Sequence, residues 1–135
     1  MQIKLNTDYA LRILTYLARK ERIVSSKELA EQLNIPQVIA LRVGGELRDA
    51  KYIDILTGPF GGFVLAMKPR EITVYDIVLL MEQTIKLNRC LDDEKFCGRN
   101  VMDACCVHGF FAELQSLLEE KMKGTTLADL LETDT

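Results

Sequence analysis

Apolar residues recur at every third or fourth position over much of this chain, the spacing that places them on one face of an α-helix. In the first half this pattern predicts three helices, over about residues 7–20, 26–33 and 36–50. Two short runs rich in β-branched and aromatic residues follow at 52–56 and 63–65, with a glycine-rich turn between them. These patterns predict three helices and then a β-hairpin.

In the second half, Thr73 is placed to cap a fourth helix, after which the periodicity stops over about residues 84–100. It resumes in a long helix over about residues 104–123, and Thr125 or Thr126 can cap a short last helix. The long helix is expected to carry one apolar face, made by Val107, Phe110, Phe111, Leu114, Leu117, Leu118 and Met122. Such a face requires a partner.

Two local patterns add detail to the first half. Ser25 followed by Glu28 is a capping-box pattern at the start of the second helix. Gly44 and Gly45 lie inside the third helix, where each glycine costs roughly 1 kcal/mol relative to alanine. The glycine pair therefore predicts either a close helix crossing or local fraying.

The order of the elements indicates the fold class. A short second helix joined to the third by a tight turn, followed by a hairpin, is the order of a winged helix-turn-helix. We predict a mainly α fold with a small β-hairpin, in which residues 1–70 form a winged helix-turn-helix DNA-binding unit. Residues 71–135 add a sensor loop and a long C-terminal dimerisation helix, and the two parts form one continuous folded unit. The alternative is that the helices and hairpin only pack a core.

Composition and charge are compatible with this prediction. Of 135 residues, 48% are hydrophobic and 27% are charged, as in ordinary globular domains. No run of 18 apolar residues and no signal-peptide core is present, so we expect a cytoplasmic protein with no membrane partner. Residues 1–70 hold eleven Lys and Arg against seven Asp and Glu, whereas residues 71–135 hold six against thirteen. The modestly basic first half suits a phosphate surface.

The four cysteines are Cys90, Cys97, Cys105 and Cys106, and a reducing compartment disfavours a disulfide scaffold for them. Iron–sulfur clusters need thiolate ligands, and the first three cysteines are close enough in sequence to converge on one cluster while a fourth ligand comes from elsewhere. A zinc site or a redox-switching thiol pair is the alternative. Cys106 is expected to be a small buried hydrophobe.

Several segments resemble a known family. They are Asp8-Tyr9-Ala10-Leu11-Arg12, the wing Gly58-Pro59-Phe60-Gly61-Gly62-Phe63-Val64-Leu65, Ile72-Thr73-Val74-Tyr75-Asp76-Ile77 and the cysteines from Cys90 onward. Over nearly its whole length the chain resembles the Rrf-type (IscR/NsrR/CymR-like) winged helix-turn-helix transcriptional regulators. The resemblance implies a homodimer whose long penultimate helices pack together and whose winged helices read a palindromic operator in double-stranded DNA. Many members of this family hold an iron–sulfur cluster, so the resemblance also implies one here.

The resemblance also implies metal ligands. The family's cluster ligands map onto Cys90, Cys97 and Cys105, which six and seven intervening residues separate, a looser spacing than members usually show. The cluster type, [2Fe-2S] or [4Fe-4S], therefore stays open. The fourth ligand is either His108, three residues after Cys105, or Asp8 from the other subunit. The alternatives are that Asp8 only complements the dipole of the first helix and that His108 only packs on its helix.

In the DNA-binding half, the third helix is expected in the major groove and the glycine turn against the sugar-phosphate backbone. Gln37 and Arg42 can reach base edges or phosphates. Family members often place a small hydroxyl residue and a polar residue where Val38 and Leu41 stand, and a basic residue where Thr57 stands, so we predict a changed or relaxed operator. The predicted DNA contacts are Ser26, Lys27, Gln37, Val38, Leu41, Arg42, Arg48, Thr57, Gly58, Phe60 and Gly61.

The predicted function is that of a DNA-binding transcriptional regulator, which senses redox, nitric oxide or iron–sulfur status through a cysteine-ligated cluster. The same fold could act without a cluster, through zinc or thiol redox chemistry, or as a protein-interaction module. We expect no enzyme activity, because the chain has one histidine and lacks a nucleophile elbow, a Walker phosphate loop and a spaced carboxylate pair.

Overall fold

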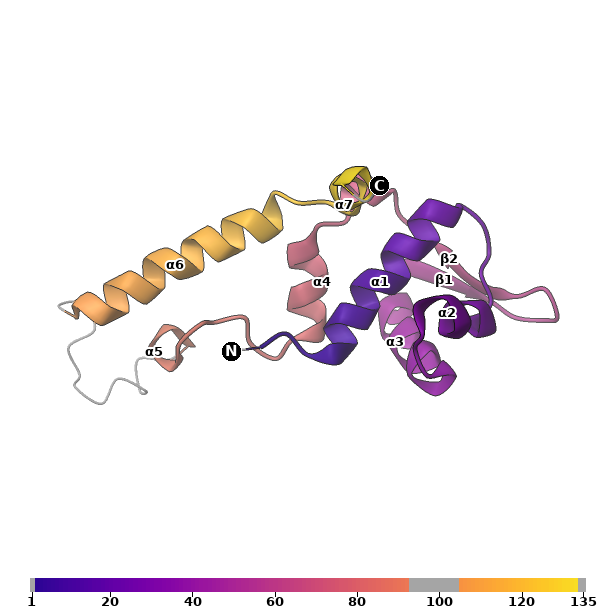
Figure 1. Cartoon of the computed structure of the whole chain (residues 1–135), viewed down its shortest axis with the longest axis horizontal. Coiled ribbons are helices and arrows are strands. Elements are labelled where there is room, and N and C mark those ends of the chain that lie inside the picture. The colour runs from indigo at the N-terminus through magenta and orange to yellow at the C-terminus, as the bar shows by residue number, and fades with distance from the viewer. Residues whose placement is uncertain (1, 93–104, 134–135) are drawn as a thin grey trace.

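The computed structural model describes residues 2–92 and 105–133, and it confirms a mainly helical fold with an antiparallel hairpin (Figure 1). Its elements are α1 (Leu5–Lys20), α2 (Ser26–Leu33), α3 (Gln37–Asp49), β1 (Ile53–Leu56), β2 (Gly62–Leu65), the 3-10 helix η1 (Pro69–Glu71), α4 (Val74–Met81), α5 (Arg89–Asp92), α6 (Cys106–Lys123) and α7 (Leu127–Thr133). The two elements that lie where none is predicted are η1 and α5, because three and four residues are too few to show a helical period.

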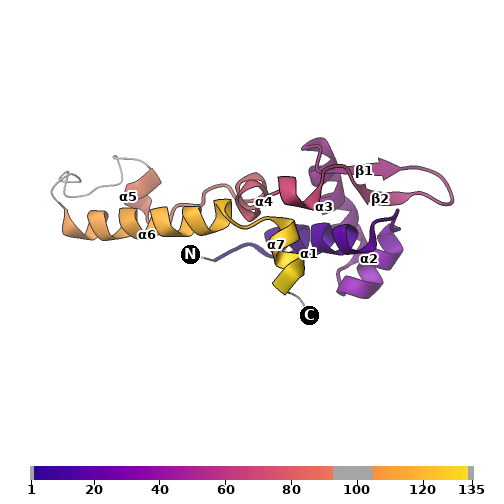
Figure 2. The same cartoon turned by 90° about the horizontal axis from the view of Figure 1, so that it is seen from above.

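The elements divide between two ends of the molecule. Helices α1 to α3 and the hairpin gather at one end, whereas α6 extends away from them with α5 beside its start (Figures 1 and 2). Helix α7 then returns to pack against α1 and η1. None of the helices in the described part of the chain is long and apolar enough to cross a membrane.

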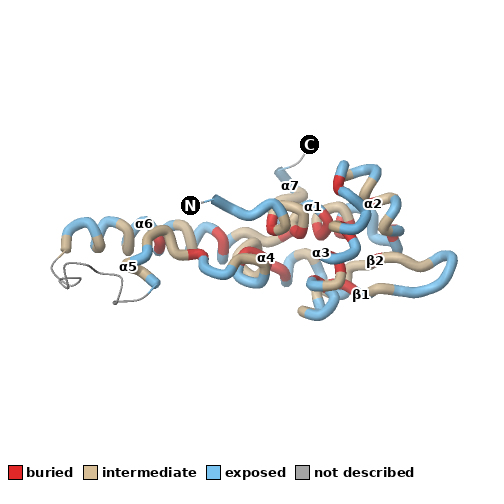
Figure 3. Tube along the Cα trace, turned by 90° about the horizontal axis from the view of Figure 1, so that it is seen from below, coloured by how far each residue is buried: buried red, intermediate tan, exposed pale blue. Residues whose placement is uncertain are grey.

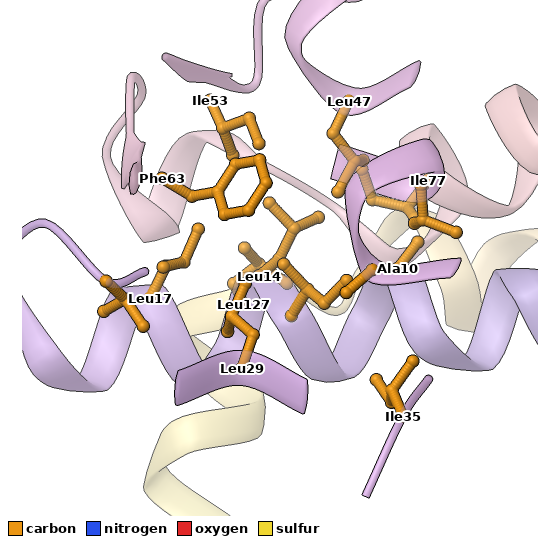
Figure 4. Close-up of a cluster of buried hydrophobic side chains, with 14 of the residues drawn as sticks. Ala10, Leu14, Leu17, Leu29, Ile35, Leu47, Ile53, Phe63, Ile77 and Leu127 are labelled. Atoms are coloured by element: carbon orange, nitrogen blue, oxygen red, sulfur yellow. The ribbon is translucent and has the colours of Figure 1, made fainter. Parts of the chain in front are cut away.

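The main hydrophobic core lies in the winged-helix end and draws on nearly all of its elements. The side chains labelled in Figure 4 are Ala10, Leu14, Leu17, Leu29, Ile35, Leu47, Ile53, Phe63, Ile77 and Leu127. Two of them come from α4 and α7, so the second half of the chain helps to close this core. The predicted domain boundary at residue 70 stays a prediction.

Threonine caps begin both α4 and α7, as predicted. The Thr73 hydroxyl accepts from the backbone N–H of Asp76 at 3.1 Å, and the Asp76 carboxylate accepts from the Thr73 N–H at 3.1 Å. Thr126 and Asp129 make the same reciprocal pair, at 3.1 and 2.9 Å. Each pair satisfies two backbone donors that a helix start would otherwise leave open.

The hairpin is joined to the helices through Phe63. This residue lies opposite Ile55 in the hairpin, and on its other edge it exchanges backbone hydrogen bonds with Val24 at 2.7 and 2.8 Å. Its ring is buried against α3, where a Cβ added to Gly44 would lie 2.5 Å from the ring atom Cε1. Gly44 therefore makes room for an aromatic ring, and the expectation of a helix crossing or fraying is wrong.

Gly45, the next residue, has a different environment, because an added Cβ would meet nothing within 4 Å. We predict that Gly44→Ala lowers the free energy of unfolding by about 1–3 kcal/mol through overpacking against Phe63. Gly45→Ala, the matched control, should raise it by up to about 1 kcal/mol. Urea denaturation followed by circular dichroism measures both, and a change of the same sign in the two variants would contradict this account.

Helix α6 carries two apolar rows where one face is predicted. Phe111, Leu118 and Met122 are half-buried or buried, and Leu118 and Met122 pack with Val78 of α4. Figure 3 shows exposed and partly buried positions alternating along α6. The exposed large apolar residues on this helix form the other row, which consists of Val107, Phe110, Leu114 and Leu117. Within the described part of the chain, the first row packs on α4 through Leu118 and Met122, whereas Phe110 of the exposed row contacts the Phe111 ring of its own helix.

Candidate functional site

The predicted DNA contacts on α2 and α3 lie at the winged-helix end. Gln37 donates from its side-chain amide to the Ser26 hydroxyl at 3.0 Å, which joins the starts of the two helices. Lys27, Val38, Leu41 and Arg42 are exposed around this junction. These residues are free to contact an outside surface.

Arg48 lies further along α3 and differs from them. Its guanidinium pairs with Asp49 at 3.3 Å, so an acidic neighbour offsets its charge. This pair is exposed on both sides and contributes little to stability. The structure thus places Arg48 near the end of the helix, beside a carboxylate that repels phosphate.

A partly exposed network of hydrogen bonds joins α2 to α1. The Glu28 carboxylate accepts from Arg22 at 2.8 and 3.1 Å and from the Tyr16 hydroxyl at 2.6 Å. Hydrogen bonds from Arg22 and then from Tyr16 lower the pKa of Glu28, so the carboxylate stays charged near neutral pH. Ser25 caps α2 by accepting from the Glu28 N–H at 3.1 Å. The carboxylate half of the predicted capping box is replaced by this network.

The wing turn is short and held by backbone geometry. The Gly61 N–H donates to the Gly58 carbonyl at 3.0 Å, and Gly58 has a φ of 105°, in the region that favours glycine. A Cβ on Gly61 would collide with the carbonyl of Leu56. The turn thereby presents Thr57 and Phe60 to solvent, with Phe60 91% exposed.

At the opposite end, His108 lies beside two of the predicted cysteine ligands. The His108 ring atom Nδ1 lies 3.3 Å from Cys90 Sγ, and the His108 backbone N–H donates to Cys105 Sγ at 3.5 Å. Cys105 is the N-cap of α6, and Cys90 belongs to α5, which packs on α6. Cys97 lies outside the described residues. Among residues 2–92 and 105–133, no three His, Cys, Asp or Glu residues form a group that could hold a metal ion.

The remaining candidates lie differently. Cys106 is exposed, so the expectation of a buried hydrophobe is wrong. Asp8 is in the first turn of α1 at the winged-helix end, and its carboxylate accepts from Arg12 Nε at 2.7 Å (Figure 1). Within one chain Asp8 is therefore separate from the cysteine end, and it could join that end only from another subunit.

Gln115, which the sequence analysis does not single out, aligns the cysteine end. It is 4% exposed, accepts from the Leu87 N–H at 2.8 Å and donates to the Ile85 carbonyl at 3.0 Å. These bonds tie the segment before α5 to the middle of α6, and so hold Cys90 opposite His108. The sequence feature that could have identified Gln115 is that it is one amide residue within the inner apolar row of α6.

We predict that Gln115→Leu destabilises the chain by about 1–3 kcal/mol, because two backbone groups of the 85–87 segment lose their partners. Thermal unfolding measures this change. Ser116→Ala is the matched control, since Ser116 is exposed on the same helix. Equal stabilities of the two variants would show that the amide bonds do not hold the segment.

The donor set at the cysteine end fits an iron–sulfur cluster. Thiolate sulfur and imidazole nitrogen are ligands of iron–sulfur clusters and of zinc. Cys90, Cys105 and His108 supply both kinds, and Cys97 adds a third sulfur in sequence. The positive end of the α6 dipole is at the same place and suits an anionic ligand set.

Comparisons with known proteins describe similar chains. The family model Rrf2, iron-dependent transcriptional regulator, matches residues 3–133. An Aquifex aeolicus protein described as an HTH-type transcriptional regulator is 36% identical over 91% of this chain and 86% of its own. The regulator NsrR of Halalkalibacterium halodurans is 33% identical over 97% and 90%. The solved structure of CymR, the global cysteine regulator of Bacillus subtilis, has a TM-score of 0.84 and 26% identity, covering 100% of this chain and 99% of that one.

Proposed function

Because the chain belongs to the Rrf2 family of transcriptional regulators, we propose that it is a homodimer that binds a palindromic operator and holds an iron–sulfur cluster at its cysteine end. The family is one of DNA-binding proteins and not of enzymes. The observation that carries the cluster is that His108 contacts Cys90 Sγ through its ring and Cys105 Sγ through its backbone N–H, both at the start of α6. Cys97 supplies the third thiolate in this proposal.

His108 is the fourth ligand that the geometry favours, because its ring already lies 3.3 Å from Cys90 Sγ. Asp8 of a second subunit is the competing ligand. When bound, a cluster with one non-sulfur ligand supplies a labile iron, which would respond to nitric oxide, to oxygen or to the supply of clusters. The protein's part is to hold the thiols and the imidazole together and to couple their arrangement to the winged helix.

That coupling follows the packing of α4. Helix α6 packs on α4 through Met122 and Val78, and Ile85 belongs to the same cluster. Helix α4 in turn packs on α1, and Glu82 at its end accepts from the Lys4 N–H at 2.8 Å. A change in the segment before Cys90 therefore reaches the winged helix through contacting elements, which can bias two arrangements of a dimer.

Anaerobic reconstitution with iron and sulfide tests the cluster. Wild-type protein should become brown, with thiolate-to-iron absorbance and bound iron, because Cys90, Cys97 and Cys105 supply three thiolates close together in sequence. Cys97→Ala should lose most of the iron. Cys106→Ala removes an exposed thiol next to Cys105 and should keep the iron. Colourless wild-type protein that still binds DNA fully would contradict the cluster proposal but not the function as a DNA-binding regulator.

A thiol-redox regulator is the second candidate, favoured by the 3.3 Å contact between Cys90 and His108 and by the likeness to CymR. Two thiols would join in a disulfide, releasing two protons and two electrons to an external oxidant. Metal analysis separates the candidates: iron in anaerobically purified protein supports the cluster. Metal-free protein whose free thiols fall in number on oxidation supports the thiol switch.

The exposed row of α6 supports the homodimer. Val107, Phe110 and Leu117 are each more than half exposed, and a long helix with such a row buries it against another surface. We predict that Leu117→Glu converts a dimer to a monomer in sedimentation velocity, because it places a charge in that interface. Ser116→Glu adds the same charge to the same helix away from the row and should leave the dimer intact. A monomeric wild-type protein would contradict the proposal.

A further inference from the structure

The outward face of α3 is apolar in its first half. Val38 is 74% exposed and Leu41, one turn later, is 49% exposed. The amide of Gln37 is engaged by Ser26 at 3.0 Å, and Arg42 is the one cation between residues 37 and 44. What this half of the helix offers to a partner is mainly methyl groups beside a single guanidinium.

The second half of α3 is unsuited to a phosphate surface. Glu46 and Asp49 are exposed there, and Asp49 pairs with Arg48 at 3.3 Å. The exposed cation Lys27 lies instead on α2, whose start is joined to that of α3. Charge therefore favours a duplex seated against the first half of α3, with Val38 and Leu41 directed at its groove.

Gly45 supports a close approach on the same face. It follows Leu41 by four residues, so the two lie one turn apart on one side of the helix. Interior packing does not require this glycine, since an added Cβ would meet nothing within 4 Å, whereas Gly44 is required by the Phe63 ring. A glycine that weakens a helix without serving its packing allows an outside surface to come close to the backbone.

The wing extends this apolar character. Residues 52–67 contain no Lys or Arg, and Leu56 and Phe60 are 45% and 91% exposed. A wing without cations adds little to the phosphate attraction. Discrimination between sequences then depends on what α3 can read.

We infer that α3 recognises thymine, with Val38 and Leu41 contacting thymine C5 methyl groups in the major groove and Gly45 letting the helix sit deeply. The C5 methyl is the apolar group that the base pairs present there, and apolar side chains are its natural contacts. The inference rests on the DNA binding that family membership supplies. It assigns an A·T-containing half-site whose thymine positions are fixed by Val38 and Leu41.

The test removes single methyl groups from the DNA. Full-length protein selects a duplex from a random-sequence pool, and each thymine of that duplex is then replaced by deoxyuracil, which lacks only the C5 methyl. Fluorescence anisotropy at fixed salt should show Kd rising about fourfold for each contacted methyl, equivalent to about 0.8 kcal/mol. Thymines outside the contacts should show no change.

Matched variants identify the reading side chains. At the position that Leu41 contacts, the Leu41→Ala protein should bind duplexes with thymine and with deoxyuracil equally well, because the methyl group has lost its partner. Val38→Ala should show the same loss of discrimination at a different thymine. Leu79→Ala removes an equally exposed leucine from α4 and should discriminate as the wild type does. Gly45→Ala should weaken binding to every duplex although its folded state is no less stable.

Two results overturn the inference while leaving DNA binding in place. One is a selected duplex that wild-type protein binds equally with thymine or deoxyuracil at every position. The other is a Leu41→Ala and a Val38→Ala protein that both discriminate as the wild type does. Absence of any salt-dependent duplex binding by wild-type protein would instead overturn the regulator function itself, and the inference with it.

Discussion

After α6 the chain returns to its own winged helix, and this return anchors the starts of α4 and α7 and the base of α6. Thr73 and Thr126 form an antiparallel bridge, Val74 donates to the Thr125 carbonyl at 2.8 Å, and Leu127 donates to the Ile72 carbonyl at 2.9 Å. Leu127 is fully buried in the main core. The starts of α4 and α7 are thus paired, so the base of α6 is tied to the winged helix at a point that hydrophobic burial protects.

From that base, α6 extends away from the main core, and the structure holds its far end in a different way. The inner row packs on α4 only near its base, through Leu118 and Met122. Further out, Gln115 replaces apolar packing with two hydrogen bonds to the 85–87 segment. Buried polar bonds of this kind specify one alignment, because a shifted segment would leave the amide unpaired. The cysteine end is therefore aligned by a few directional contacts and is easier to shift than the winged helix.

The sequence predicts the elements that local chemistry determines. Periodicity, turn glycines and the threonine caps at Thr73 and Thr126 act over a few residues, and the structure confirms them. The sequence could not predict how the apolar residues of α6 divide into two rows, because the partner of the inner row is α4, which is far away in sequence. Glu28 likewise matches a capping box locally, but a distant Tyr16 and a nearby Arg22 compete for its carboxylate. Distant hydrogen-bond partners of this kind cannot be recognised from the local spacing of residues.

The same limit applies to the candidate sites. Cysteine spacing predicts a shared site for Cys90 and Cys105, and the structure brings both to His108. The burial of Cys106 was predicted from residue type alone and is wrong, because its place on the first turn of α6 exposes it. Position on an element, and not chemical character, decides exposure for small residues.

Adjacent glycines in α3 show how structural and functional constraints can be separated. Both have the same intrinsic cost in a helix, and the sequence treats them as a pair. The inward one is explained fully by the Phe63 ring, which leaves no room for a Cβ. The outward one has no such explanation within the described chain, and it stands on the face that carries Val38 and Leu41. A residue that costs stability and serves no internal contact points to a contact outside the chain, and this is the ground on which we infer that Gly45 lies against the duplex.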